Sequence, residues 1–300
     1  MKISVIINVH RGTDINQFHA AADSVLAQDY DDFEFVVVVS DAPKIKTQIE
    51  SRYGSHSKLT VVTLETDDGL SVARNAGAQA ASGDVVVFTD DDIVAELDWL
   101  TELRTIYNEY DPAGVGGHVD PLWPSQKPWY FPNEFFWLVG VMHDNFVDTN
   151  TPQPVRNTFG CNISFKRDVF LNTGGFRKDL GKNQLNPLQG EEAELCERLD
   201  DEFWYTPHAL VSHRVDTSQL GFWYLHRRSF WQGYSKAALA KDVSGERSFL
   251  SYVVQKSIPN RVLNPSAKHF GEILTLLSLT MAVVLGFSYA KCSQWKKSRD

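Results

Sequence analysis

Three consecutive carboxylates, Asp90, Asp91 and Asp92, directly follow a short apolar run in the sequence. The run, residues 85–88, is β-branched and too short for a buried helix, which predicts a strand buried on both faces inside a parallel sheet. Successive side chains of an extended segment point to opposite faces, so we expect Asp90 and Asp92 to share one side and Asp91 to point away. Two carboxylates on one side suit a cation such as Mg²⁺ or Mn²⁺ that bridges to nucleotide phosphates. The triplet alone is equally consistent with a solvated acidic turn.

The elements that must position these carboxylates alternate between strand and helix patterns. Strands are predicted over residues 3–9, 33–39 and 59–64, and helices over residues 14–28 and 69–81. This alternation predicts an α/β fold with a central, mostly parallel sheet, whose site lies at the carboxyl ends of the strands. Further along the chain the pattern predicts helices over 97–110, 190–203 and 220–240, and strands over 114–119, 162–165 and 209–212.

The composition excludes some classes of partner. The chain has 300 residues, 43% of them hydrophobic, which is enough for a large core. Its net charge of −9 and the lack of a basic stripe in the first 250 residues argue against nucleic acid as a partner. Cys161, Cys196 and Cys292 lie far apart without metal-like spacing, which fits a reduced compartment. The chain starts on a strand pattern, so we expect no secretory segment.

Four blocks of the sequence together resemble family 2 glycosyltransferases of the GT-A fold. They are Asp41 at a strand end, Leu-Ser-Val-Ala-Arg-Asn-Ala-Gly at 70–77, the triplet at 90–92, and Gly-Glu-Glu-Ala-Glu-Leu at 190–195. The four blocks in this order are much more specific than any one of them, and the resemblance extends to about residue 234. It implies a GT-A catalytic domain over residues 1–245. Beyond it we expect a connecting amphipathic segment at 246–272 and a hydrophobic membrane helix at 273–290.

The resemblance also implies how a UDP-sugar donor is bound. Asp41 would accept hydrogen bonds from the uracil end of the donor, and Arg74 would pair with a donor phosphate through its N–H groups. Val9 and Asp91 complete the expected donor-binding residues. Asp41 could instead be only a turn former before Pro43, and Arg74 an ordinary surface residue of a helix.

A divalent cation, Mn²⁺ or Mg²⁺, is the cofactor that the resemblance implies. Asp92 and Asp90 would be ligands, with Asp90 also able to meet the ribose. His213 matches a histidine that follows the last strand in several members of the family and completes the metal site, for which a neutral imidazole is suited. A structural role for this histidine is equally possible. The metal would stabilise the departing diphosphate.

The catalytic base implied by the resemblance is Glu192, at the place where the family usually has Asp. The base takes a proton from the acceptor hydroxyl as that oxygen attacks the anomeric carbon opposite the leaving group, which inverts the anomeric centre. A carboxylate at a helix N-terminus is favoured in its charged form, which suits a base and also explains the residue as an ordinary helix start. The longer Glu leaves Glu191 as the alternative base.

Three aromatic-rich blocks, at residues 129–140, 156–163 and 230–236, look like the haloarchaeal branch of the family that extends lipid-linked glycans. This likeness implies UDP-glucuronate as donor and a sugar on a dolichyl or other polyprenyl phosphate as acceptor. Trp and Tyr favour the membrane interface, where such an acceptor is met, although ordinary packing explains them as well. Arg156, Arg227 and Arg228 are candidates to contact the acceptor phosphate or the donor carboxylate.

The segment at residues 273–290 is uncharged and near the lower length limit for a helix that crosses a bilayer. A buried core helix is the alternative, but the terminal position and the lack of a polar face favour the membrane. The basic residues Lys291, Lys296, Lys297 and Arg299 would place the tail in the cytoplasm by the positive-inside rule, yet a soluble donor is also cytoplasmic. We expect the catalytic part at the cytoplasmic face of the cell membrane, with the segment spanning the bilayer or lying in that face.

Two other functions remain open at this point. A polyprenyl-phosphate sugar synthase would use the phosphate itself as acceptor, so replacing Glu192 by Gln should hardly slow it. A membrane-attached nucleotide-sugar binder would have no activity, but the carboxylates at Asp90, Asp92 and Glu192 argue against that class.

Overall fold

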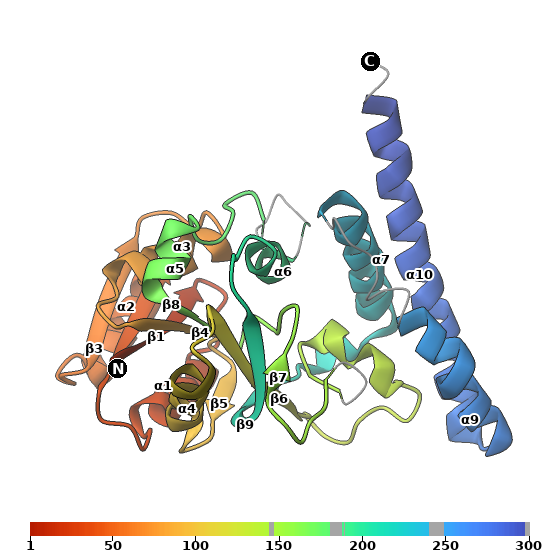
Figure 1. Ribbon diagram of the computed structural model, residues 1–300, viewed down its shortest axis with the longest axis horizontal. Helices are drawn as coiled ribbons and strands as arrows, with labels where there is room; N and C mark the ends of the chain where they lie inside the picture. The colour runs from red at the N-terminus through yellow and green to blue at the C-terminus, as the bar shows by residue number, and fades with distance from the viewer. Residues whose placement is uncertain (144–146, 181–187, 189, 240–248, 298–300) are drawn as a thin grey trace. The chain divides into compact units, whose positions relative to one another are not determined.

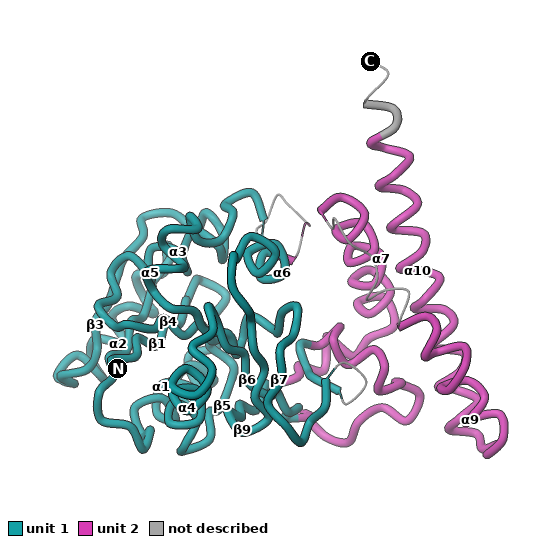
Figure 2. Tube along the Cα trace, viewed as in Figure 1, with its two compact units in different colours: residues 1–122, 140–187, 191–214 teal, residues 123–139, 188–190, 215–300 magenta. Residues whose placement is uncertain are grey.

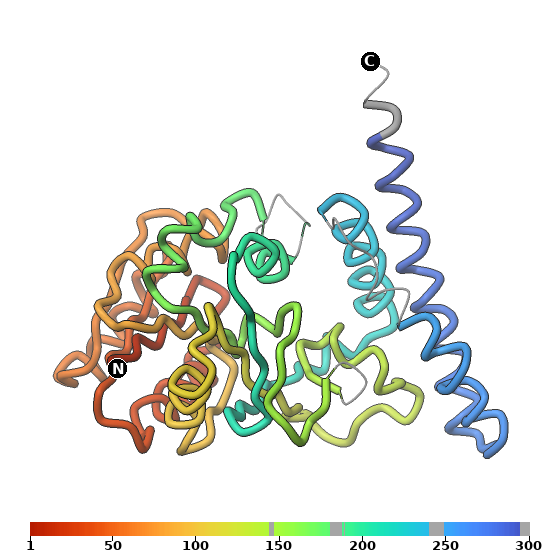
Figure 3. The backbone as a smooth tube through the Cα atoms, in the orientation of Figure 1, coloured from red at the N-terminus to blue at the C-terminus, as the bar shows by residue number. Residues whose placement is uncertain are grey.

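The computed structural model describes residues 1–143, 147–180, 188, 190–239 and 249–297 (Figure 1). The chain divides into two compact units (Figure 2). Unit 1 comprises residues 1–122, 140–187 and 191–214, and unit 2 comprises residues 123–139, 188–190 and 215–300. The chain therefore passes between the units more than once, and its course can be followed by residue number in Figure 3. Part of the expected connecting segment, residues 246–248, and the basic Arg299 lie outside the described residues.

Unit 1 is built on a nine-stranded sheet of order β3-β2-β1-β4-β8-β6-β9-β5, with β7 paired to β9. Its first half is parallel throughout, as the sequence predicted. The strands of this half are β1 (Ile3–His10), β2 (Phe33–Ser40), β3 (Leu59–Leu64) and β4 (Val85–Thr89). Every residue of β4 is buried, which confirms the interpretation of its apolar run and places Asp90 at its carboxyl end.

The second half of the sheet is mixed. It contains β5 (Ile93–Ala95), β6 (Gly114–Leu122), β7 (Gln153–Pro154), β8 (Ile163–Lys166) and β9 (Phe203–Arg214). β6 and β9 are parallel, whereas β8 is antiparallel to both β4 and β6, and β5 is antiparallel to β9.

The predicted helix over 190–203 is wrong at its C-terminal end. The helix α6 (Glu191–Cys196) is short, and the long strand β9 already begins at Phe203. Phe203 and Tyr205 are buried while Trp204 between them is only partly buried, so the chain here has the two-residue period of a strand. Pairing with β6 over nearly its whole length extends β9 well before the predicted start at residue 209.

Helices cover both faces of the sheet in unit 1. The helices are α1 (Ile15–Leu26), α2 (Pro43–Tyr53), α3 (Leu70–Ala80), α4 (Trp99–Tyr110) and α5 (Arg167–Asn172). One core cluster joins α1, α2 and α4 to alternate residues of the parallel strands, and a second joins α3 and α5 to the residues between them. The sequence missed α2 because only Ile49 and Tyr53 of that mostly polar helix are buried.

Unit 2 is helical. It contains the 3₁₀ helices Asn133–Val139 and Thr217–Leu220, the helix α7 (Phe222–Leu239), a π-helical turn at Val253–Ser257, α9 (Ile258–Leu263) and α10 (Ala267–Lys297). The predicted helix over 220–240 corresponds to α7. The apolar segment 273–290 lies inside α10, and within the described residues α10 alone is long and apolar enough to cross a membrane.

Candidate active site

Asp90, Asp92 and His213 come together at the carboxyl end of β4. One ligand atom from each residue lies within 4.8 Å of the other two. The sheet explains the arrangement, because β5 pairs with β9 in a register that sets Ile93 opposite His213 and so brings Asp92 beside the imidazole. His213 Nε2 lies 3.4 Å from Asp92 Oδ1. Two carboxylates and one imidazole form a donor set that suits Mn²⁺ or Mg²⁺.

Gly140 lies against the imidazole ring of His213. It has a φ of 72°, which favours glycine. A Cβ atom there would lie 3.3 Å from His213 Cε1, so a side chain would press on the imidazole. This contact could not be predicted locally, since Gly140 ends the aromatic block at residues 129–140 and is far from His213 along the chain.

Arg74, on α3, connects this cluster to the helix α6. Its side chain is only 3% exposed. Nη2 donates to Asp90 Oδ1 at 3.0 Å and to the Gly160 carbonyl at 2.9 Å, and Nη1 donates to Glu192 Oε1 at 3.2 Å. Glu191 Oε1 lies 3.8 Å from Nη1. Sequence reasoning expected a donor phosphate as the partner of Arg74 and did not foresee these carboxylates.

Glu192 is a carboxyl group suited to accept a proton near neutral pH. Burial and the charge of Glu191 raise the pKa of Glu192 to about 7, against the opposing effect of Arg74. Gly160 makes room for the pair, because a Cβ atom at that position would collide with both Glu192 Oε1 and the Arg74 guanidinium. A base is most effective when its pKa lies near the working pH, so this geometry favours acid–base chemistry at Glu192.

Asp41 lies at the end of β2 in the left-handed region, with a φ of 47°. Its carboxylate accepts a hydrogen bond from Arg11 Nη2 at 2.7 Å, and its carbonyl accepts another from Arg11 Nε. Backbone strain at a non-glycine residue persists only where neighbours hold it, and it is concentrated at functional sites. The sequence did not single out Arg11.

The remaining donor-binding candidates differ in what they can offer. Val9 is fully buried in the core of the sheet, so its side chain is unavailable to a ligand and only its backbone could contribute. Asp91 lies in the turn between β4 and β5, and the metal cluster is formed by its neighbours Asp90 and Asp92 with His213. Burial raises the pKa of Asp91, although a hydrogen bond with Thr13 opposes that effect.

The candidate arginines of the acceptor site belong to different units. Arg156, in unit 1, forms an ion pair with Glu197. Arg227 and Arg228 lie on α7 in unit 2.

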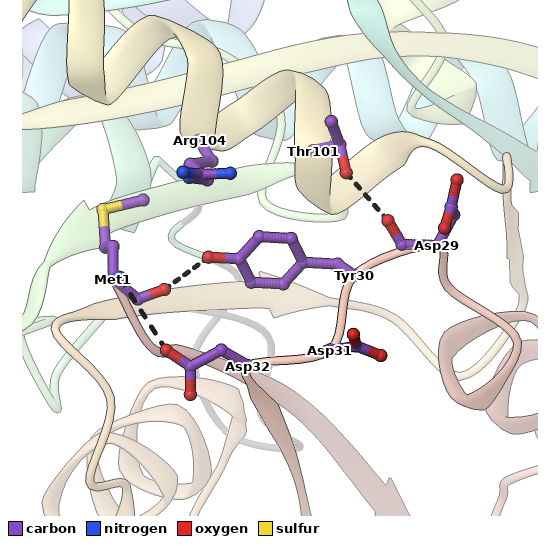
Figure 4. Close-up of a pocket in the computed structure, with 7 residues that line it drawn as sticks. All are labelled: Met1, Asp29, Tyr30, Asp31, Asp32, Thr101 and Arg104. Atoms are coloured by element: carbon purple, nitrogen blue, oxygen red, sulfur yellow. Dashed lines mark hydrogen bonds and ion pairs between the residues drawn. The ribbon is translucent and has the colours of Figure 1, made fainter.

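A pocket of about 390 Å³ elsewhere in unit 1 contains none of the predicted residues (Figure 4). It is lined by Met1, Asp29, Tyr30, Asp31, Asp32, Thr101 and Arg104.

Comparison with known proteins gives one family and a consistent fold. A family model described as glycosyl transferase family 2 matches residues 4–174. The glucosyl-dolichyl phosphate glucuronosyltransferase of Haloferax volcanii is 35% identical, and the alignment covers 96% of each chain. A mannosyltransferase of Pyrobaculum calidifontis in complex with GDP-Man and Mn²⁺ superposes with a TM-score of 0.64 at 16% identity, covering 96% of this chain and 86% of that one. S. aureus TarS in complex with UDP-GlcNAc gives 0.58 at 17% identity, covering 94% and 82%.

Proposed function

The chain belongs to glycosyltransferase family 2 and has the GT-A fold, and we propose that it transfers glucuronic acid from UDP-glucuronate to a sugar carried on dolichyl phosphate. The observation that carries the proposal is the similarity to the Haloferax volcanii enzyme, whose name describes this reaction. Because that similarity covers 96% of both chains, it includes the C-terminal helices as well as the part matched by the family model. The product would be an extended lipid-linked glycan for protein N-glycosylation at the cell surface.

In this proposal Asp90, Asp92 and His213 hold a divalent cation. The donor set fits Mn²⁺ or Mg²⁺, and the three ligand atoms lie within 4.8 Å of one another, close enough to bind one cation. When bound, the cation neutralises charge that develops on the departing diphosphate. Asp41 would accept hydrogen bonds from the uracil beside Arg11, with Asp91 and the backbone of Val9 nearby in the donor site.

Glu192 is the proposed catalytic base. Its carboxylate takes the proton of the acceptor hydroxyl while the hydroxyl oxygen forms a bond to the anomeric carbon. The bond from that carbon to the diphosphate breaks, and UDP leaves with the electron pair, so a single displacement inverts the anomeric centre. Arg74 holds Glu192 and Asp90 through the two ends of one guanidinium, which fixes the base relative to a metal ligand.

A donor and acceptor screen tests the proposal. Purified full-length protein with Mn²⁺ is incubated with UDP-glucuronate, UDP-glucose, UDP-N-acetylglucosamine or GDP-mannose, and with short polyprenyl-phosphate-glucose. Mass detection should show one hexuronic acid added to the lipid, with UDP-glucuronate only. Transfer to polyprenyl phosphate itself would instead identify a sugar synthase, and UDP binding without consumption of any donor would identify a binder.

A further inference from the structure

One face of α10 carries an exposed apolar row. Its six members are 46% to 66% exposed and recur every three or four positions, so they lie on one side of the helix. They are Phe270, Leu274, Leu277, Met281, Val284 and Leu285. No charged residue occurs between Glu272 and Lys291. A continuous apolar surface of this kind marks a contact with another apolar phase or partner.

The opposite face of α10 is covered by α7, within unit 2. Leu276, Leu279 and Ala290 are almost completely buried. The two backbones approach closely at Gly233 and Gly286: a Cβ atom on either glycine would collide with the backbone of the other helix. The two helices therefore run side by side from about Ser278 of α10 onward, along the second half of the apolar row (Figure 2).

This pairing bears on whether α10 can cross a bilayer. His226 bonds to Ser278, and Gly233 meets Val283, so Arg227 and Arg228 of α7 lie beside the most apolar part of α10. If α10 spanned the membrane with α7 attached, both arginines would enter the hydrocarbon, where a charged side chain is strongly disfavoured. If α7 detached instead, the backbones now packed at the glycines would lose their contact.

The residues around the row are those of a helix that lies at a membrane surface. Lys268, with a side chain 57% exposed, stands before the row, and the exposed Lys291 follows it. Trp223, 81% exposed, and Phe222, 59% exposed, lie at the start of α7. Lysine ammonium groups meet lipid phosphates and indole rings favour the headgroup region, so the chemistry of these residues fits a lipid leaflet.

We propose that α10 docks in the plane of one membrane leaflet, with its apolar row in the acyl region and α7 on the other side of it, and does not cross the bilayer. The surface is a site for a lipid leaflet, and it deepens the proposed function because a lipid-linked acceptor is then met from the same leaflet. This proposal rests on the proposed function because it requires an enzyme that works at a membrane. It does not depend on which sugar is transferred.

Labelling from one side of sealed vesicles tests the orientation of α10. Gln294, exposed after the row, is changed to Cys in a chain carrying Cys292→Ser, since the other cysteines are buried or partly buried. Ser51→Cys, exposed on α2, reports the side on which unit 1 lies. An impermeant maleimide should label both positions equally before detergent is added. If Ser51→Cys is labelled before detergent and Gln294→Cys only after it, the helix spans the bilayer and the proposal fails.

Sedimentation with phosphatidylglycerol vesicles tests the row itself. We expect Met281→Glu to weaken binding by about tenfold or more, because it places a charge among residues that enter the acyl region. Leu97→Glu is the matched control, since Leu97 is 60% exposed in unit 1 and should bind vesicles like the unchanged chain. Melting temperatures confirm that both variants fold.

The same samples test separately what covers the apolar row and whether the chain transfers sugar. An unchanged chain that ignores vesicles but is a dimer, and that Met281→Glu converts to a monomer, would show that a second copy covers the row and would overturn the proposal. Transfer to a short-chain, water-soluble acceptor should persist in Met281→Glu. If the unchanged chain transfers no sugar at all yet sediments with vesicles, the proposed function fails and the docking surface stands.

Discussion

An arginine lies at the centre of a charge cluster in each unit, with a side chain 3% exposed for Arg74 in unit 1 and 14% exposed for Arg261 in unit 2, and the two clusters differ in their charge balance. In unit 1, Nη atoms of Arg74 face Asp90, Glu192 and Glu191 within 3.8 Å, while its Nε is buried and has no hydrogen-bond partner among the described residues. In unit 2, Arg261 donates to both oxygens of Glu134 at 2.8 and 3.0 Å, and its Nε donates to a second carboxylate at 2.9 Å.

The pKa directions of the carboxyls follow this difference. In unit 1 burial and a neighbouring carboxylate raise the pKa of Glu192 to about 7. In unit 2 burial alone would raise the pKa of Glu134, but hydrogen bonds from Arg261 and Ser257 outweigh it and lower that pKa. Lys127 and Lys268, each with Nζ 4.0 Å from Glu272, add positive charge to the second cluster.

The comparison separates a structural cluster from a functional one. Buried charges with matched partners and complete hydrogen bonds fix a packing arrangement. In unit 1 the carboxylates around Arg74 outnumber the positive charges, so the site can bind a metal cation. One of these carboxylates can also accept a proton, which an acceptor hydroxyl would supply. The unit 1 cluster is therefore the one expected to show chemistry when perturbed.

The largest expected effect comes from removing the metal ligands. Asp92→Asn should lower the rate of transfer by about a thousandfold, because the developing charge on the diphosphate loses its electrostatic partner. Chelation of the unchanged chain should do the same and should be reversed by Mn²⁺. The measurement is the initial rate against Mn²⁺ concentration. Glu272→Gln, from the balanced cluster, is the control, and an equal loss of Mn²⁺ response in that variant would remove the distinction between the clusters.

The second expected effect is on the free energy of unfolding, for which the cluster of unit 2 should matter more than that of unit 1. Glu134→Gln removes the two charged hydrogen bonds from Arg261 to Glu134 and leaves the arginine paired with Glu272, so we expect the free energy of unfolding to fall by about 2 kcal/mol. Glu192→Gln should leave stability unchanged or raise it, because it relieves repulsion by Glu191. Urea denaturation of the full chain measures both. A Glu134→Gln chain as stable as the unchanged one would show that the unit 2 cluster is not structural.

The two clusters should also respond to pH in opposite directions. Glu192 has a folded pKa of about 7, above its ordinary 4.5, so its contribution to stability is fully present below pH 4.5 and is lost as pH rises through 7. Glu134 has a lowered pKa, so its contribution is present above pH 4.5 and is lost as pH falls. The measurement is the urea midpoint from pH 3 to 8. Glu192→Gln should remove only the loss of stability between pH 4.5 and 7, and Glu134→Gln only the loss of stability below pH 4.5.

The smallest expected effect compares two glycines in unit 1. Gly140 has a φ of 72° and Gly174 a φ of 87°, so an alanine at either position should cost about 1 kcal/mol in backbone strain. A Cβ atom at Gly174 meets nothing within 4 Å, whereas one at Gly140 presses on His213. Melting curves titrated with Mn²⁺ should therefore show weaker metal binding in Gly140→Ala only. Equal metal binding in the two variants would argue that His213 is not a ligand.

The sequence predicted those features that depend on neighbours along the chain. The parallel strands follow from short β-branched runs. Asp90 and Asp92 do lie in one cluster, as expected, although residues 91–92 form a turn and not the extended segment on which that expectation rested. The family resemblance added His213, which strand pairing then brings to the same end of the sheet. These predictions needed no knowledge of distant contacts.

The partners that set the chemistry could not be predicted, because they are distant in sequence. Arg74 and Glu192 are 118 positions apart, and only the packing of α3 against the rest of unit 1 brings them together. Gly160 matters for the same reason, because a side chain there would collide with both Glu192 and Arg74. The unit 2 cluster did have one signal, since Glu134 interrupts an aromatic run and an acidic residue in such a setting needs a buried partner.

The most direct test of the account is the rate of glucuronic acid transfer by Glu192→Gln and Glu191→Gln at saturating Mn²⁺ and UDP-glucuronate, with UDP binding measured in the same samples. We expect Glu192→Gln to bind UDP normally and to lose on the order of a hundredfold in rate, because the acceptor hydroxyl then has no base. Glu191→Gln should keep most of its activity. If Glu192→Gln transfers sugar at nearly the unchanged rate while Glu191→Gln does not, Glu192 is not the base and the account is contradicted.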